Sequence, residues 1–137
     1  MRTARLKLED RVEFLGVQRD VPALMPRFDF FVLPSLWEGL PNVVIEAMAA
    51  RRAVVATNVD GTPEAVGHGW TGLLVPPAHP GALAQAMERM LREPATRQKF
   101  GEAGRRKAEE QFGLRRMIAE TEDVYREALA EARPGDC

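Results

Sequence analysis

The sequence predicts an α/β domain in which short parallel strands alternate with helices, followed by a group of C-terminal helices. Two segments, Phe30–Leu33 and Ala53–Thr57, are continuously apolar, which is typical of strands buried on both faces of a parallel sheet. Asn42–Ala50, which lies between them, has the composition of a buried helix. From Pro80 onward, apolar residues recur at helical spacing instead. Strands that alternate with helices in this way form parallel βαβ units with right-handed crossovers.

The N-terminal region predicts one strand and one short helix. Residues 1–10 have the pattern of the last turns of a helix. Arg11–Leu15 alternates polar and apolar residues and is followed by Gly16, so we expect a short strand there. Val21–Phe28 is predicted to be a short helix, because Asp20 can cap its start and a proline lies in its first turn.

The middle of the chain predicts two loops and a last strand. Pro34–Pro41 and Asn58–Pro63 are rich in residues that favour loops, and Glu64–Val66 can form at most a helical turn. Gly72–Val75 is predicted to be a short strand, because it is apolar and two prolines stop it.

Three amphipathic helices are predicted in the C-terminal part, and we expect them to pack on the sheet. Their apolar residues are Ala82, Leu83, Ala86, Met87, Met90 and Leu91 in the first, Phe100, Ala103, Ala108 and Phe112 in the second, and Met117, Ile118, Thr121, Val124, Tyr125 and Leu129 in the third. No linker divides the chain, so one domain is predicted over residues 1–132, with a frayed tail at 133–137.

The bulk composition excludes several classes of function. The chain has 137 residues with a formal net charge of −1, so no overall basic field is present to attract nucleic acid or anionic lipid. No apolar run approaches the roughly 20 residues that span a bilayer. The single cysteine, Cys137, allows no internal disulfide, which suits a reducing compartment. We therefore expect a cytoplasmic protein without a transmembrane segment.

The segment Ser35–Ala49 carries the candidate chemistry. It leads from the end of a buried strand, through a loop with a glycine, into a helix that begins near Pro41. Ligands of open α/β sheets bind at the carboxyl ends of strands, and the free N–H groups at the start of a helix attract phosphate. Gly39 allows a ligand to approach the backbone closely. Ser35 can bond a phosphate or cap the loop. The backbone donors available here are those of Leu40, Asn42 and Val43.

Two glutamates flank this predicted phosphate site. Glu38 lies in the loop, and Glu46 lies about one turn inside the helix on the same face as Asn42. A carboxylate is a strong acceptor for paired sugar hydroxyls, so the arrangement suits a ligand with a sugar at both ends of a diphosphate. The alternative interpretation is structural: Glu38 can favour the helix dipole, and Glu46 can pair with a nearby arginine. From the residues alone, both interpretations stay open.

The surroundings of the two glutamates resemble a known signature. Glu38 and Glu46 form an E-x7-E pair inside LPSLWEGLPNVVIEAMA, a pattern similar to that of the retaining glycosyltransferases of the GT-B fold, family 4, also called the group 1 glycosyltransferases. Arg11–Ser35 resembles the family's strand, base-contacting loop, helix and next strand, and Ala53–Pro77 resembles the stretch after the signature. The resemblance covers about Leu8–Leu129. It implies a Rossmann-like parallel sheet, the C-terminal half of the GT-B fold, followed by C-terminal helices.

The resemblance also implies a role for each matched position. Glu38 is implied to be the catalytic residue, which binds hydroxyls of the transferred sugar and supports the developing charge. The donor is a UDP- or GDP-linked sugar, the acceptor is a sugar or lipid, and neither a metal nor another cofactor is expected. The implied donor-binding residues are Gly39, Leu40, Asn42 and Val43 through their backbone N–H groups, Glu46 through the ribose hydroxyls, and Val17 and Gln18 beside the base.

Two places depart from the family pattern. After EAMAA the family usually has a glycine and, two residues later, a proline, where this chain has Arg51 and Ala53. Glycine commonly ends a helix in the left-handed conformation, so we expect Arg51 to strain or reshape that turn. Asp60 replaces the first of two common glycines before the TPE segment. Neither change touches Glu38 or Glu46.

Members of this family are far longer than 137 residues. They carry an N-terminal domain for the acceptor and a first βα unit of the donor domain, with an arginine and a lysine for the diphosphate. Their strand order places Arg11–Leu15 at an edge, separated from Phe30–Leu33 by two strands that this chain lacks. We therefore expect an incomplete sheet with exposed edges, which favours weak stability or self-association.

Two functional hypotheses follow. The first is the donor-binding part of a hexose-transferring enzyme that needs a missing N-terminal domain, is inactive alone, and is cytoplasmic or peripheral to the membrane in its full form. The second is a non-catalytic truncated remnant or protein-interaction module. A dinucleotide-dependent oxidoreductase is disfavoured, because no G-x-G-x-x-G follows any predicted strand.

Overall fold

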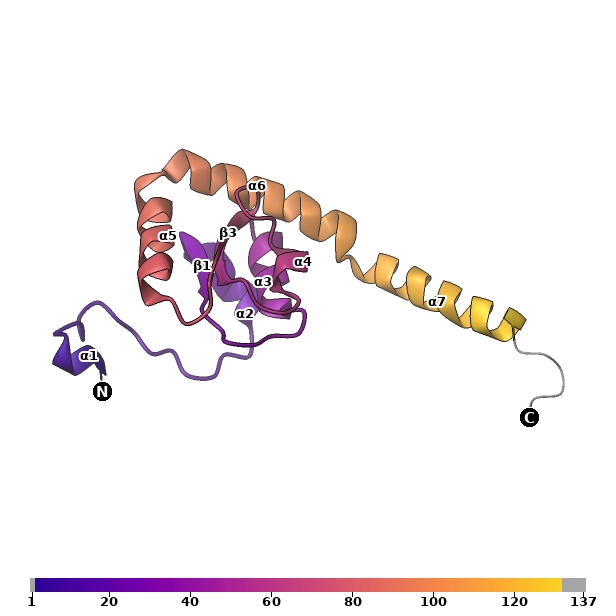
Figure 1. The fold of residues 1–137 in the computed structure, drawn as a ribbon, viewed down its shortest axis with the longest axis horizontal. Helices are drawn as coiled ribbons and strands as arrows, with labels where there is room; N and C mark the ends of the chain where they lie inside the picture. Colours follow the sequence, from indigo (N-terminus) through magenta and orange to yellow (C-terminus); the bar gives the residue numbers. More distant parts are fainter. Residues whose placement is uncertain (1, 132–137) are drawn as a thin grey trace.

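A three-stranded parallel sheet forms the centre of the molecule (Figure 1). The computed structural model describes residues 2–131, so the predicted tail at 133–137 lies outside it. The strands are β1 (Phe30–Leu33), β2 (Ala53–Thr57) and β3 (Gly72–Val75), and they are hydrogen-bonded in the order β1-β2-β3. The sequence predicted all three strands at these bounds, and the α/β class is confirmed.

The central strand separates two apolar cores. All five residues of β2 are buried, and they alternate between the two faces of the sheet. Val54 and Ala56 pack with the residues of α3 (Asn42–Ala49), whereas Val55 packs with α5 (Pro80–Arg92) on the other face. Both faces are therefore covered by helices, as is typical of parallel sheets.

The edge strand β1 is less buried than its apolar sequence predicts. Each of its four residues is only half-buried. Its sole strand partner among the described residues is β2, which pairs Phe31 with Val54 in register. The expectation that Phe30–Leu33 is fully buried on both faces is therefore wrong in degree: its side chains pack on both cores, but within the described residues no strand pairs with its outer edge.

The helix α6 (Pro94–Gln111) crosses the amino end of the sheet. Its Gly101 lies so close to the backbone that a Cβ there would come 2.2 Å from the Arg51 carbonyl oxygen. Arg51 has a φ of 59°, so it adopts the left-handed conformation that glycine favours, as the comparison with the family pattern led us to expect. The amino end of the sheet is thus closed by α6, and the carboxyl ends of the strands stay open to the loops.

The N-terminal region contains less structure than predicted. The expected strand at Arg11–Leu15 is wrong: this segment has no strand partner, and Phe14 is 66% exposed. Strand hydrogen bonds come from a neighbour, and the described chain offers none at this position. Upstream lies a short helix, α1 (Arg2–Arg5). Downstream, α2 (Val21–Leu24) and a 3-10 turn, η1 (Met25–Arg27), match the predicted short helix.

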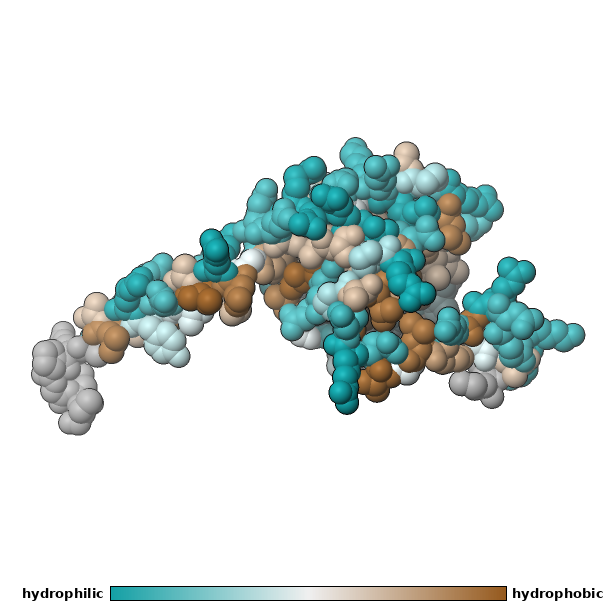
Figure 2. Space-filling model, turned by 180° about the vertical axis from the view of Figure 1, so that it is seen from behind, coloured by the Kyte–Doolittle hydropathy of each residue, from teal (hydrophilic) through white to brown (hydrophobic). Residues whose placement is uncertain are grey.

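The last helix does not pack on the sheet as the sequence led us to expect. Figure 1 shows α7 (Leu114–Glu131) projecting from the end of α6, away from the sheet. It contains no buried residue, and Tyr125 and Leu129 are 67% and 75% exposed. Apolar atoms are visible along α7 in Figure 2. Its apolar stripe is therefore not buried by any element of the described residues. No helix in that range is long and apolar enough to cross a bilayer.

Candidate functional site

Two loops meet at the carboxyl ends of β1 and β2. The loop after β1 contains Ser35 and Glu38, and the loop after β2 leads into the short helix α4 (Thr62–Ala65). The Thr57 hydroxyl at the end of β2 donates to the Ser35 carbonyl oxygen at 2.5 Å. The Ser35 hydroxyl in turn donates to Glu38 Oε1 at 2.6 Å. The side chain of Glu38 is therefore oriented by its own loop, which the sheet end anchors.

The same loops are in backbone contact. Asp60 Oδ2 accepts a hydrogen bond from the Glu38 N–H group at 2.9 Å. A Cβ placed at Gly61 would lie 2.6 Å from the Gly39 carbonyl oxygen, so only glycine fits this approach. The candidate loop is thus held from two sides, by the end of the sheet and by the loop after β2.

The start of α3 offers unpaired backbone donors. Pro41 occupies the N-cap position, and the first helical bond runs from the Val44 N–H group to the Pro41 carbonyl at 3.0 Å. Four amides before Val44 donate to no other group within residues 2–131. That set comprises the N–H groups of Gly39, Leu40, Asn42 and Val43. Such donors at a helix start attract anions.

Glu46 lines a pocket that does not include Glu38. Its side chain is half-buried and lines a pocket of about 340 Å³ between α2 and α3, with Pro22 and Pro26 on the opposite wall. Neither Glu46 nor Glu38 forms a salt bridge within the described part of the chain. The arginine partner that the structural alternative required for Glu46 is not present there, and Glu38 is bonded by the Ser35 hydroxyl but by no basic group of the described residues.

The predicted base-contacting residues lie just before α2. Val17 is 96% exposed, and the Gln18 side-chain amide donates to the Leu15 carbonyl at 2.5 Å. The chain then enters α2, whose Pro22 faces the Glu46 pocket. The segment therefore leads toward that pocket but forms no enclosed site by itself.

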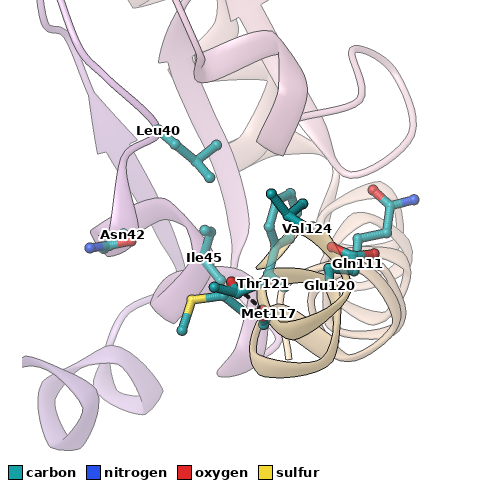
Figure 3. Close-up of a pocket in the computed structure, with 9 residues that line it drawn as sticks. Leu40, Asn42, Ile45, Gln111, Met117, Glu120, Thr121 and Val124 are labelled. Atoms are coloured by element: carbon teal, nitrogen blue, oxygen red, sulfur yellow. Dashed lines mark hydrogen bonds between the residues drawn. The ribbon is translucent and has the colours of Figure 1, made fainter. Parts of the chain in front are cut away.

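A second hollow lies at the start of α3 and was not predicted. Figure 3 shows a pocket between the beginning of α3 and the α6–α7 junction. Its volume is about 380 Å³. Its floor is mostly apolar, and the Thr121 hydroxyl is bonded to the Met117 carbonyl at 2.7 Å. The amphipathic pattern of residues 114–131 was the available signal, but it does not say what the apolar face meets. The lining residues are Leu40, Asn42, Ile45, Gln111, Phe112, Met117, Glu120, Thr121 and Val124.

Residues 1–93 match the family model described as Glycosyl transferases group 1, which is more than half of the chain. The chain belongs to the group 1 glycosyltransferases. The E-x7-E resemblance of the sequence therefore led to the correct family, and the match covers all three strands and the loop–helix segment of the candidate site.

Two synthases are similar to nearly the whole of this chain. The α-maltose-1-phosphate synthase of Mycobacterium tuberculosis is 35% identical over 94% of this chain. The N-acetyl-α-D-glucosaminyl L-malate synthase of Bacillus anthracis is 32% identical over 95% of it. In both cases the chain spans 34% of the relative's length.

Solved structures of glycosyltransferases share the fold. Sucrose-phosphate synthase from Thermosynechococcus elongatus superposes with a TM-score of 0.88 at 33% identity, over 96% of this chain and 33% of that protein. Anabaena Alr3699/HepE in complex with UDP gives a TM-score of 0.84 at 31% identity, over 90% of this chain and 35% of that protein. The sheet and helices are those of the C-terminal half of the GT-B fold.

Three further polar residues of this glycosyltransferase chain have structural roles. His68 Nδ1 accepts from the Leu74 N–H group, and His79 Nδ1 caps α5 by accepting from the Ala82 N–H group, both at 3.0 Å. Lys107 of α6 is buried and donates to the last carbonyls of α4, at 2.6 Å and 2.8 Å. Burial lowers the pKa of the Lys107 ammonium. The run of basic residues Arg105-Arg106-Lys107 predicts a solvated helix face, and for Lys107 this prediction is wrong.

Proposed function

We propose that this chain is the donor-binding part of an enzyme that transfers a hexose from a nucleoside diphosphate sugar to an acceptor, with retention of configuration. The observation that carries the proposal is the row of amides at the start of α3 that are unpaired within residues 2–131, together with the carboxylates of Glu38 and Glu46, which form no ion pair in that range. Helix-start amides suit a diphosphate, and carboxylates suit the hydroxyls of a sugar.

The roles of the residues follow from their places. Glu38, oriented by the Ser35 hydroxyl, is proposed to bind hydroxyls of the transferred sugar and to stabilise the positive charge that develops on it. The free amides of Gly39, Leu40, Asn42 and Val43 are proposed to bind the diphosphate, and Glu46 in the α2–α3 pocket to bind the ribose hydroxyls. Because Ser35 uses its hydroxyl on Glu38, its proposed role is to orient that carboxylate and not to bind phosphate.

The favoured donor is a UDP-linked hexose. Anabaena Alr3699/HepE is known in complex with UDP and with UDP-glucose, and this chain is 31% identical to it. A GDP-linked sugar is the alternative donor. The proposed mechanism uses no metal ion, because backbone amides take the place of a cation at the diphosphate.

A second domain is needed for turnover. The chain spans about a third of the length of its relatives, and 33% and 35% of the two GT-B structures above. We propose that the acceptor, a sugar or lipid, is held by an N-terminal domain, since the site of a two-domain enzyme lies between the domains. This chain alone is expected to bind the donor weakly and to transfer nothing.

Isothermal titration calorimetry of the chain with UDP-glucose and GDP-mannose tests the proposal. Glu46→Ala should abolish measurable binding, because it removes the acceptor for the ribose. Glu127→Ala is the matched control, since Glu127 is exposed on α7 and makes no salt bridge within the described residues. Equal binding by both variants would refute the assigned site.

The alternative function is a non-catalytic interaction module. The unpartnered apolar stripe of α7 and the open edge of β1 favour it. Sedimentation velocity over a range of concentrations tests this alternative. Concentration-dependent dimers, together with no response to either nucleotide sugar, would support the module and argue against the donor site.

A further inference from the structure

Asp60 is held in an unusual backbone conformation beside the candidate site. Its φ is 41°, in the left-handed region that residues with a Cβ rarely adopt. Aspartate and asparagine tolerate this region better than other such residues, because their short side chains can form local hydrogen bonds. A strained position that persists next to a binding loop is a reason to ask what its side chain does.

The side chain of Asp60 joins two segments that are far apart in sequence. Its Oδ2 accepts from the Glu38 N–H group at 2.9 Å, across 22 residues. A hydrogen bond to an ionised carboxylate is stronger than one between neutral groups. The neighbouring backbone of Gly61 packs against Gly39, which leaves no room for a Cβ. The bond therefore forms where the two loops already touch.

Two contacts then fix Glu38 from opposite ends of the residue. Asp60 holds its backbone N–H group, and Ser35 holds its carboxylate at 2.6 Å. Because the Glu38 amide is occupied by a carboxylate of the chain, it is not available to a phosphate. The amides of Gly39, Leu40, Asn42 and Val43 at the start of α3 donate to no other group of residues 2–131.

We propose that Asp60 is a positioning residue that sets the backbone of the Glu38 loop before the ligand arrives. Fixing a loop in its bound conformation raises affinity, because less ordering remains to be done on binding. The expected effect of Asp60 on donor affinity rests on the proposed function. The hydrogen bond between Asp60 and the Glu38 amide does not depend on it. Asp60 thus extends the candidate site from the loop after β1 to the loop after β2.

Three substitutions separate positioning from a merely structural role. Asp60→Asn keeps a side-chain oxygen acceptor and tolerates the left-handed backbone. Asp60→Ala removes the acceptor and keeps the unfavourable φ. Asp60→Gly removes the acceptor and relieves the φ restriction. Asp60→Gly should therefore unfold at the same temperature as the unaltered chain or higher, while it loses the contact to Glu38.

The first measurement needs no ligand. In ¹⁵N–¹H spectra of the chain, the Glu38 amide proton should move upfield and exchange with water several-fold faster in Asp60→Ala and Asp60→Gly, and change least in Asp60→Asn. An unchanged Glu38 amide in the alanine and glycine variants would overturn the proposal.

The second measurement is the affinity for UDP-glucose by calorimetry. We expect a loss of about fivefold or more in Asp60→Ala and Asp60→Gly, and less than about twofold in Asp60→Asn, for the ordering reason given above. Full affinity in Asp60→Gly would contradict positioning. If the Glu38 amide responds as expected but the unaltered chain does not bind UDP-glucose, the contact between Asp60 and Glu38 is supported and the proposed donor is contradicted.

Discussion

The interior around β2 is more completely buried than the two margins of the chain. The margins are the segment around Phe14, before α2, and the helix α7. Met48 and Val54 in the interior are fully buried, whereas Phe14 and Leu129 at the margins are 66% and 75% exposed. The interior is closed by α3, α5 and α6 without help from any other chain. The margins carry apolar surface that the described residues leave uncovered. Stability should therefore reside in the interior, and association in the margins.

The largest effect should come from emptying the interior. Met48→Ala removes a fully buried side chain under Gly104 of α6, and we expect a loss of about 2–5 kcal/mol in the free energy of unfolding. Met117→Ala makes the same chemical change at a residue that is 58% exposed, and should cost less than about 0.5 kcal/mol. Urea denaturation of both variants measures the difference. Equal losses would contradict the claim that stability resides in the interior.

A smaller loss should follow from crowding the contact between α6 and the sheet. Gly101→Ala places a Cβ 2.2 Å from the Arg51 carbonyl oxygen, so the helix must shift, at about 1–3 kcal/mol. Gly81→Ala in α5 is the matched control, because its Cβ meets nothing closer than 3.6 Å and alanine favours a helix. Thermal unfolding should show a lower Tm for the first variant only.

Lys107, the buried lysine of α6, should contribute more to stability than its exposed neighbour. Lys107→Met leaves the Glu64 and Ala65 carbonyls without their donor, which should cost about 1–3 kcal/mol, while Arg106→Met on the exposed side should cost little.

Burial lowers the pKa of Lys107 below its ordinary value of 10.5, so between the two values the unfolded chain binds more protons than the folded one. The unaltered chain should therefore gain stability relative to Lys107→Met as the pH rises through that window. Denaturation at several alkaline pH values checks the sign, and a difference that shrinks with rising pH would contradict the burial.

The smallest effect on stability should come from the margin. Val124→Ser on α7 changes a residue that is 65% exposed, so the free energy of unfolding should move by less than about 0.5 kcal/mol. Self-association should nevertheless fall, because apolar contact area is removed. Sedimentation velocity of this variant and of the control Glu127→Ser measures the change. If the unaltered chain is a monomer at every concentration, α7 does not mediate self-association.

The sequence was most informative where a residue's environment is decided locally. The continuous apolar run at Ala53–Thr57 predicted β2 at its observed bounds, because a strand buried on both faces has no polar side. The left-handed turn at Arg51 could also be expected, since helices commonly end in that conformation. For the candidate site, the order of loop, Pro41 and helix predicted the unpaired amides.

Long-range partners could not be predicted in the same way. The alternation at Arg11–Leu15 is typical of a strand, but a strand exists only beside a neighbour. The amphipathic pattern of α7 indicates a face that could be buried, and says nothing of what buries it. The bond between Asp60 and the Glu38 amide joins loops that only the folded sheet brings together. Such contacts depend on the topology, which local pattern does not encode.

The start of α3 is the centre of the functional account, and it can be tested directly by titrating ¹⁵N-labelled chain with UDP-glucose and following its amide resonances. Binding at the helix start should shift the amides of Gly39, Leu40, Asn42 and Val43 most strongly, with a smaller change at Glu46. Saturating ligand that leaves those four amides unmoved, or that shifts only residues of the pocket beside α7, would contradict the account.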